Sequence, residues 1–148
     1  MILPKDDTGV WRSIRREGAL EVLLDIADAD ATAHARLLHE ARSAAALNHP
    51  NICRVHEVSD SNGVPFIAME LIGGETLQAA LRRRPMSPER VCRTGPQLAA
   101  ALEHAQAHGI VHRDFKTANV MLRSDGRSKV LDLGIATRAE SPQEQLER

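Results

Sequence analysis

The segment His112–Asn119 reads HRDFKTAN, and the tripeptide Asp132–Gly134 reads DLG. Between them, the apolar-rich runs Val120–Leu122 and Lys129–Leu131 flank Ser124–Gly126, whose serine, aspartate and glycine are typical of a turn. The stretch therefore predicts a loop, a short β-hairpin and a second acidic residue directly after the hairpin. We expect the side chains of Asp114, Asn119 and Asp132 to converge on a common point.

This pair of motifs resembles two signatures of protein kinases, the catalytic loop and the Asp-Phe-Gly motif. The joint pattern carries the resemblance, with Asn119 five residues after Asp114 and Asp132 beyond the hairpin. Lys116 favours the serine/threonine branch, since tyrosine kinases and small-molecule phosphotransferases usually have other residues at this position. Aminoglycoside-type phosphotransferases share the spacing, but Arg113 and Lys116 argue against that class.

The resemblance implies a role for each polar residue of the two motifs. Asp114 would accept the proton of the substrate hydroxyl, and Lys116 would contact the γ-phosphate of ATP. Asn119 and Asp132 would hold Mg²⁺ against the ATP phosphates. Phosphoryl transfer depends on alignment and charge neutralisation more than on covalent work, which is why these residue types suit it. The implied cofactors are ATP and Mg²⁺.

The remaining sequence predicts an α+β, two-lobed fold with a cleft at a hinge. A strand-rich half with one helix precedes Gly73-Gly74, and a helical half followed by small strands comes after it. Within the last predicted helix, Thr94-Gly95-Pro96 is expected to kink or break the chain, because proline removes a backbone donor. The expected strands are 10–14, 19–24, 52–58, 64–71 and 110–111, and the expected helices are 30–47, 76–84 and 88–108.

The resemblance to kinases extends through both halves. Glu40 lies at the ion-pair position of a segment that looks like the αC helix, and Phe66–Leu77 resembles the strand and hinge that hold adenine. It implies an N-lobe over residues 1–72, with an antiparallel sheet and the αC helix, and the first part of a helical C-lobe over 73–148. The implied adenine-binding set is Met69 as gatekeeper, the backbone of Glu70 and Ile72, and the apolar Val10, Ala19 and Met121.

One position departs from the family pattern in the strand Ala19–Leu23. Glu21 stands where the phosphate-binding lysine is expected. A carboxylate there would face both Glu40 and the ATP phosphates, and like charges at ~4 Å repel by ~4 kcal/mol at an effective dielectric constant of about 20. We therefore expect weak ATP binding and poor positioning of the αC helix. The alternative is a basic substitute from another strand, for which the candidates are Lys5, Arg12 and Arg15.

Both ends of the chain also differ from a complete kinase domain of roughly 250 residues. Only Asp7–Val10 remains of the glycine-rich loop, and the polar tail Ser141–Arg148 stands where an activation segment is expected. The fold is thus expected to be incomplete. The Leu98–Ala105 face should then be exposed to water and available to a partner chain or an oligomer. Arg113, which usually pairs with a phosphorylated activation loop, is left without an assigned role.

Three functional hypotheses follow. The first is a Ser/Thr protein kinase that phosphorylates protein hydroxyls but is impaired or inactive as a lone chain. The second is a non-catalytic, pseudokinase-like module that regulates another kinase or receptor. The third is a remnant of a kinase gene.

Composition limits the other classes of partner. A formal net charge of −1 in 148 residues argues against nucleic acid as the main partner. No apolar run approaches the ~20 residues of a membrane helix, and the start of the chain lacks the layout of a signal peptide. Cys53 and Cys92 are too few for a disulfide framework, which favours a reducing, cytoplasmic compartment.

Overall fold

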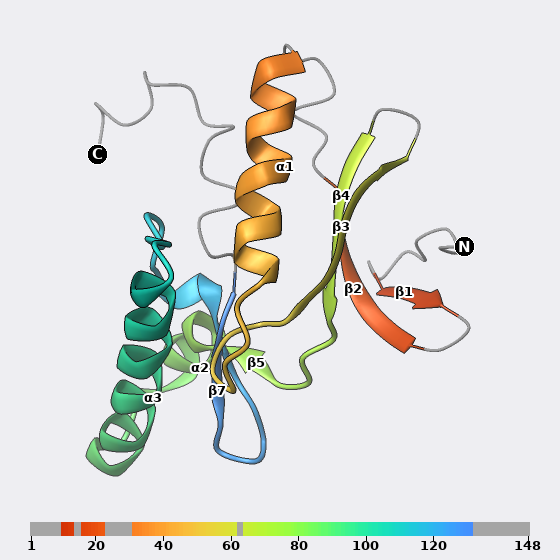
Figure 1. Cartoon of the computed structure of the whole chain (residues 1–148). Coiled ribbons are helices and arrows are strands. Elements are labelled where there is room, and N and C mark those ends of the chain that lie inside the picture. Colours follow the sequence, from red (N-terminus) through yellow and green to blue (C-terminus); the bar gives the residue numbers. More distant parts are fainter. Residues whose placement is uncertain (1–9, 14–15, 23–30, 62–63, 132–148) are drawn as a thin grey trace, which may run out of the picture.

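The computed structural model describes residues 10–13, 16–22, 31–61 and 64–131. Within these ranges, a four-stranded sheet and one long helix form the first half, and helices with a small three-stranded sheet form the second (Figure 1). This is the two-lobed α+β arrangement that the sequence predicts. None of the helices in the described ranges combines the length and the apolar character needed to cross a bilayer.

The first sheet consists of β1 (Val10–Ser13), β2 (Arg16–Val22), β3 (Val55–Ser61) and β4 (Val64–Glu70). All neighbouring strands are antiparallel, in the order β1-β2-β4-β3. Each of the four strands overlaps an expected one. The predicted strand 52–58 begins three residues later than expected, because Ile52 pairs with Val130 of the second half instead of joining the sheet.

Helix α1 (Ala31–Ala45) packs against this sheet through small side chains. Ala41 is fully buried and Ala44 nearly so, and both belong to one apolar cluster with Ile67 of β4. Alanine at the contact lets the helix lie close to the strand, as a close-packed interior requires. The cluster continues into the second half of the chain through Leu47, Ile52, Ala101, Ala105 and Val130. This cluster therefore joins both halves of the chain.

The second half contains α2 (Leu77–Arg83), α3 (Pro88–Ala107), the 3-10 helix η2 (Thr117–Asn119) and the strands β5 (Glu75–Thr76), β6 (Val120–Leu122) and β7 (Ser128–Val130). Each of the two α-helices begins at a side-chain cap. The Thr76 hydroxyl accepts the Ala79 N–H at 3.1 Å, and the Ser87 hydroxyl accepts the Arg90 N–H at 3.3 Å. These caps explain why the predicted helix starts are close to the observed ones.

Helix α3 is continuous through Pro96, so the expected break is wrong. An interior proline costs ~3 kcal/mol or more. The burial of side chains on the opposite side of the helix offsets this cost. Thr94, Ala101 and Ala105 are all buried. Gln97 adds a tether, since its side-chain amide donates to the carbonyl oxygen of Gly126 at 3.2 Å. Tertiary packing overrides the local preference.

Two further expectations for this half are wrong. The predicted strand 110–111 is not a strand, because the segment leads directly into the catalytic loop without a pairing partner among the described strands. The Leu98–Ala105 face is not exposed to water, since Ala101 and Ala105 are buried in the shared core and Leu98 packs against it. Among the residues whose exposure the structure describes, the most exposed large apolar one is Val111, at 64%.

The two halves are joined where Asn51 and Ile52 meet β7. Val130 donates its N–H to the carbonyl oxygen of Asn51 and accepts the N–H of Cys53, each at 2.8 Å. The side-chain amide of Asn51 donates to the Ser128 carbonyl oxygen at 2.8 Å and to the Gln97 side chain at 2.9 Å. The loop after α1 is thus anchored to both β7 and α3.

Gly74 marks the passage from β4 into the second half, and only glycine fits there. Its φ of 135° is one that L side chains rarely adopt, and a Cβ at this position would lie 2.1 Å from the carbonyl oxygen of Leu122. Gly73 has no atom within 4 Å of the corresponding Cβ position. Of the two glycines in the predicted hinge, Gly74 alone is needed for a close approach between its own backbone and that of Leu122.

Gly74→Ala should lower the free energy of unfolding by at least about 2 kcal/mol, because it adds both a clash and a strained φ. The matched control Gly73→Ala should change stability by less than about 1 kcal/mol. Urea denaturation followed by circular dichroism measures both. Equal losses in the two variants would contradict the close approach at Gly74.

Three histidines stack where the loop after α1 meets α3. The ring centroids of His49 and His104 are 5.0 Å apart, and those of His104 and His108 are 4.4 Å apart. Burial, and secondarily repulsion from His104, lowers the pKa of His49 below its ordinary value. His49 Nδ1 accepts the Asn51 N–H at 3.1 Å, which requires that nitrogen to be unprotonated. Neutral His49 therefore supports the anchor between the halves.

Stability should fall as the pH drops below about 6.5. The unfolded chain takes up a proton at His49 near that ordinary pKa, whereas the folded chain takes it up only at lower pH, so protons favour the unfolded state in this window. The difference in the free energy of unfolding between pH 7.5 and 5.5 should be smaller in His49→Gln than in the control His39→Gln, which changes an exposed residue of α1. Identical differences would contradict this role of His49.

Candidate active site

The catalytic-loop motif folds as one unit with the end of β7. His112 is 4% exposed, and its Nε2 lies 2.8 Å from the carbonyl oxygen of Leu131. Since a carbonyl oxygen only accepts, that nitrogen carries the hydrogen. The Leu131 N–H in turn donates to the carbonyl oxygen of Asn119 at 2.8 Å. The loop and the residue before Asp132 are thus fixed to each other.

Asp114 is the centre of the polar groups in this loop. Lys116 Nζ lies 2.7 Å from Asp114 Oδ2, and Asn119 Nδ2 donates to the same oxygen at 3.3 Å and to the Asp114 carbonyl oxygen at 3.1 Å. Arg113 turns the chain here, with a φ of 29° in the left-handed region. The structure therefore brings together the three residues predicted to be catalytic, Asp114, Lys116 and Asn119.

This arrangement keeps the Asp114 carboxylate ionised. The hydrogen bond from Lys116 is the main cause that lowers the pKa of Asp114, and the positive charge of Lys116 and the Asn119 amide act in the same direction. Partial desolvation opposes them. At neutral pH the group is thus a negatively charged acceptor that can orient a hydroxyl and receive its proton.

The predicted metal ligands are only partly described. Asn119 donates through its amide nitrogen to Asp114, which leaves its side-chain oxygen as a ligand atom. Amide and carboxylate oxygens are the donors that Mg²⁺ prefers, so Asn119 fits the predicted role. Asp132 lies outside the described residues. Among the described residues, no group of three or more His, Cys, Asp or Glu side chains is placed to hold a metal ion.

The predicted purine-binding segment lies at the end of β4. Met69 and Ile72 are partly buried, as a contact with a purine ring requires. The Glu70 N–H donates to the Arg54 carbonyl oxygen at 2.9 Å. The Glu70 carbonyl oxygen is 4.0 Å from the Cys53 thiol, a weak donor, so it is the backbone group of Glu70 better placed to bind a purine. Ile72 makes no backbone hydrogen bond with another described residue, which leaves both of its backbone groups accessible for a ligand.

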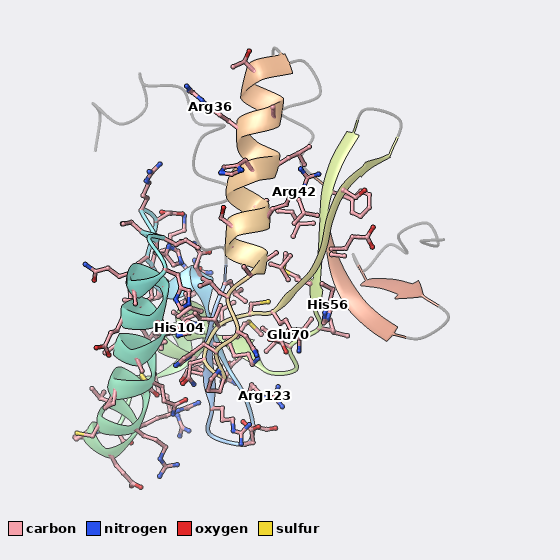
Figure 2. All side chains as sticks on the ribbon, in the orientation of Figure 1. Arg36, Arg42, His56, Glu70, His104 and Arg123 are labelled. Carbon is pink, nitrogen blue, oxygen red and sulfur yellow. The ribbon has the colours of Figure 1, made fainter. Side chains whose placement is uncertain are left out.

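The Glu70 side chain has a partner that the sequence pattern does not predict. Its carboxylate forms a largely buried salt bridge with Lys129 of β7 and also accepts the Arg54 N–H at 2.9 Å. Glu70 is labelled in Figure 2. Lys129 Nζ lies 3.4 Å from the Ile52 carbonyl oxygen as well. The hinge is thereby connected to the strand that precedes Asp132. The only sequence signal was a lysine within an otherwise apolar strand.

The other predicted binding residues are placed by strand register. Ala19 pairs with both Val10 and Met69, so all three lie on adjacent strands at one level of the sheet. Met121 of β6 is partly buried and pairs with Thr76 and Lys129.

The two acidic residues of the predicted ion-pair region belong to the first half of the chain. Glu21 pairs in register with Ile67, which lies in the core beneath α1. Glu40 is in α1, and its side chain lies outside the described part of the structure. The unexpected Glu21 is thus on the strand between β1 and β4, two residues from Ala19.

Lys116→Met should raise the pKa of Asp114 toward its ordinary value of about 3.9, because it removes the main group that stabilises the carboxylate. Carbon-detected NMR titration of the aspartate carboxyl groups measures this change. Lys116→Arg retains the charge and should keep the pKa low. The pKa of Asp125 is lowered mainly by a hydrogen bond from the Arg127 backbone N–H. This pKa is an internal reference and should be the same in both variants.

Comparison with known proteins agrees with this geometry. Residues 17–148 match the family described as protein kinase domain. The chain is 41% identical over 126 residues to a probable serine/threonine-protein kinase, SCO3848, of Streptomyces coelicolor, and 37% identical over 128 residues to serine/threonine-protein kinase PknB of Mycolicibacterium smegmatis. These alignments cover 82% and 83% of the chain but only 19% and 20% of the two proteins.

A similar relation holds for solved structures. The crystal structure of the Mycobacterium tuberculosis PknI kinase domain superposes with a TM-score of 0.76 at 30% sequence identity. That superposition covers 99% of this chain and 61% of the PknI chain. The chain therefore spans about a fifth of the length of the curated relatives it matches, and less than two thirds of a solved kinase domain.

Proposed function

Because the chain belongs to the protein kinase family, in its serine/threonine branch, we propose that it supplies a site for transfer of the ATP γ-phosphate to serine or threonine hydroxyls of a protein. The contact of Asp114 with Lys116 at 2.7 Å carries this proposal. It combines an ionised proton acceptor with a cation two residues away, and both are needed where a hydroxyl attacks a phosphoryl group.

In the proposed reaction, Asp114 accepts a hydrogen bond from the substrate hydroxyl and takes its proton as the bond to phosphorus forms. Lys116 is half exposed, so its ammonium group can exchange its contact with Asp114 for one with the γ-phosphate. Asn119 and Asp132 would hold Mg²⁺, which neutralises charge on the phosphates when bound. The protein contributes mainly alignment and electrostatic stabilisation, with little covalent chemistry.

The adenine ring would bind between the two halves of the chain, with residues 1–72 as the N-lobe and residues 73–148 as the first part of the C-lobe. Met69, the Glu70 carbonyl oxygen and Ile72 would form one edge of this site, with Val10, Ala19 and Met121 against the ring faces. The buried salt bridge between Glu70 and Lys129 supports this assignment, because it holds the hinge next to the strand that leads to Asp132.

We further propose that nucleotide binding by this chain is weak. Glu21 replaces the lysine that would pair with the ATP phosphates. A carboxylate at this position repels both the phosphates and a glutamate such as Glu40. The same observation favours a second candidate function, a non-catalytic module that retains the kinase fold and regulates a protein partner. The two functions differ in whether phosphate is transferred at all.

Glu21→Lys should strengthen binding of Mg²⁺-ATP by at least about tenfold, since it exchanges a repulsive charge for an attractive one. Glu21→Gln should give an intermediate affinity, because it removes the repulsion without adding a positive charge. Isothermal titration calorimetry measures all three proteins. An unchanged affinity in Glu21→Lys would show that Glu21 does not occupy the phosphate-binding position.

A transfer assay with Mg²⁺-ATP and a basic protein substrate separates the two candidate functions. The chain itself should transfer phosphate at or near background, and Glu21→Lys should raise transfer that Asp114→Asn then abolishes. Substantial turnover by the unmodified chain, lost in Asp114→Asn, would contradict the proposed impairment. ATP binding by Glu21→Lys without any transfer would favour the regulatory module.

A further inference from the structure

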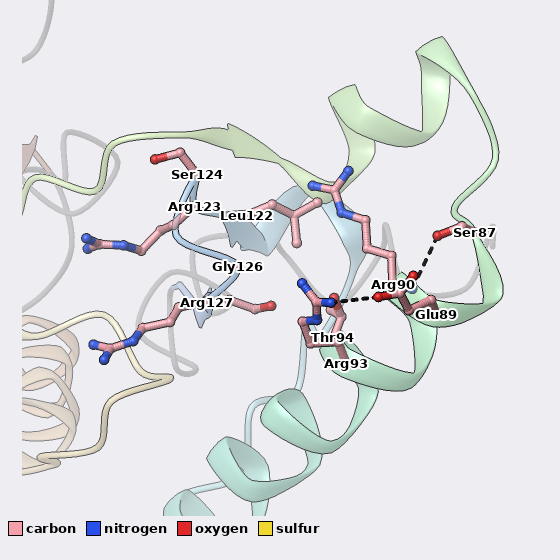
Figure 3. Close-up of a pocket in the computed structure, with 11 residues that line it drawn as sticks. Ser87, Glu89, Arg90, Arg93, Thr94, Leu122, Arg123, Ser124, Gly126 and Arg127 are labelled. Carbon is pink, nitrogen blue, oxygen red and sulfur yellow. Dashed lines mark hydrogen bonds and ion pairs between the residues drawn. The ribbon is translucent and has the colours of Figure 1, made fainter.

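A pocket of about 360 Å³ lies between the start of α3 and the turn that joins β6 to β7 (Figure 3). Arg90 and Arg93 line it from the helix, and Arg123 and Arg127 line it from the turn. No residue of the catalytic loop lines it. The turn is at the far end of the hairpin from Asn119, and a strand of three residues separates them by roughly 10 Å. The pocket is thus distinct from the proposed phosphoryl-transfer site.

The positive charge of this pocket is only partly compensated. Arg93 pairs with Glu89 at 2.9 Å, and Arg123 pairs with Asp125 at 3.2 Å. Neither Arg90 on the helix nor Arg127 on the turn forms a salt bridge with a described residue. Four arginines against the two carboxylates of Glu89 and Asp125 leave the pocket with an excess of two positive charges, although Asp125 also lies near Arg127. A phosphate monoester carries about −1.5 to −2 at neutral pH and matches this excess.

The arginines are spread along the pocket and do not meet at one point. The guanidinium group of Arg93 lies over the turn, with its Nη1 3.6 Å from the Cβ position of Gly126. In Figure 3, Arg90 extends from α3, whereas Arg123 and Arg127 extend from the turn on the side away from the helix. Such a distribution suits an anion with additional negative charges on either side, more than a lone small ion.

Polar groups at the base of the pocket are also available to an anion. In the first turn of the 20-residue helix α3, Pro88 has no N–H, and the N–H groups of Arg90 and Val91 donate to the Ser87 hydroxyl and carbonyl oxygens. The Glu89 N–H is the backbone donor that this turn leaves for an anion. Ser128 borders the pocket and is fully buried, and its hydroxyl has no hydrogen-bond partner among the described residues. A buried hydroxyl without a partner is costly and indicates a site that a ligand or its water completes.

We propose that this pocket binds a phosphorylated serine or threonine within an acidic segment of a protein chain. The phosphate binds Arg90 and Arg93 at the start of α3, and flanking carboxylates bind Arg123 and Arg127. A nucleic acid is disfavoured, because no aromatic side chain lines the pocket for base stacking and the chain carries a net charge of −1. The site would attach a phosphorylated partner to the protein away from the ATP site.

Fluorescence anisotropy with a labelled peptide, one phosphoserine between glutamates, tests this proposal. The double variant Arg90→Gln/Arg93→Gln should weaken binding by at least about tenfold, since it removes both charge-assisted contacts to the phosphate. Arg127→Gln, on the exposed turn, should weaken it by about threefold. The control Arg36→Gln, an exposed residue of α1 remote from Arg123 in Figure 2, should change it by less than about twofold.

Competition experiments show which chemical class of ligand the pocket binds. The unphosphorylated peptide and inorganic phosphate should each displace the probe only at concentrations at least about tenfold higher than the phosphopeptide. Equal displacement by inorganic phosphate or by a single-stranded oligonucleotide would overturn the proposal, as would equal weakening in Arg36→Gln. Thermal unfolding of each variant confirms that it is folded. Asp114→Asn should leave peptide binding unchanged, so this result is independent of the proposed catalytic function.

Discussion

The contact between the loop after α1 and strand β7 is the constraint on which the rest of the structure depends. Two backbone hydrogen bonds of 2.8 Å join Val130 to Asn51 and Cys53, and Ile52 enters the shared core beside them. Backbone pairing in a buried setting fixes both direction and distance, because each unpaired group there would cost free energy. The first half of the chain is therefore set against the strand that leads into the Asp-Leu-Gly motif.

Side chains extend this contact in two directions. Toward the hinge, Lys129 joins Glu70 and the Ile52 carbonyl oxygen. Toward α3, Asn51 and Gln97 connect the loop to the β6–β7 turn. The proposed purine-binding edge, the loop His112–Asn119 and the basic pocket are thus all attached to one short hairpin. A change at this hairpin would affect several sites, because a polar network of this kind transmits the loss of one member to the others.

The active-site geometry itself depends on few residues. Asp114 contacts Lys116 and Asn119 of its own loop, so the local turn is enough to bring these three residues together. The lysine at the phosphate-binding position would have to come from the other half of the chain, and there Glu21 is found. In the proposed function, the loop supplies the group for proton acceptance, whereas the strand has an acidic residue where the family pattern has a phosphate-binding lysine. This contrast is the basis for an impaired kinase or a regulatory module.

The sequence by itself determined the features that depend on local spacing. The helix starts at Thr76 and Ser87, the hairpin from Val120 to Val130 and the meeting of Asp114 with Asn119 all follow from caps, turns and short motifs. Only the tertiary structure decided that α3 continues through Pro96, that Ile52 pairs with β7, and that four arginines surround one pocket. These features depend on packing between segments far apart in the chain, and such packing can outweigh local preference by several kcal/mol without leaving a periodic signal in either segment.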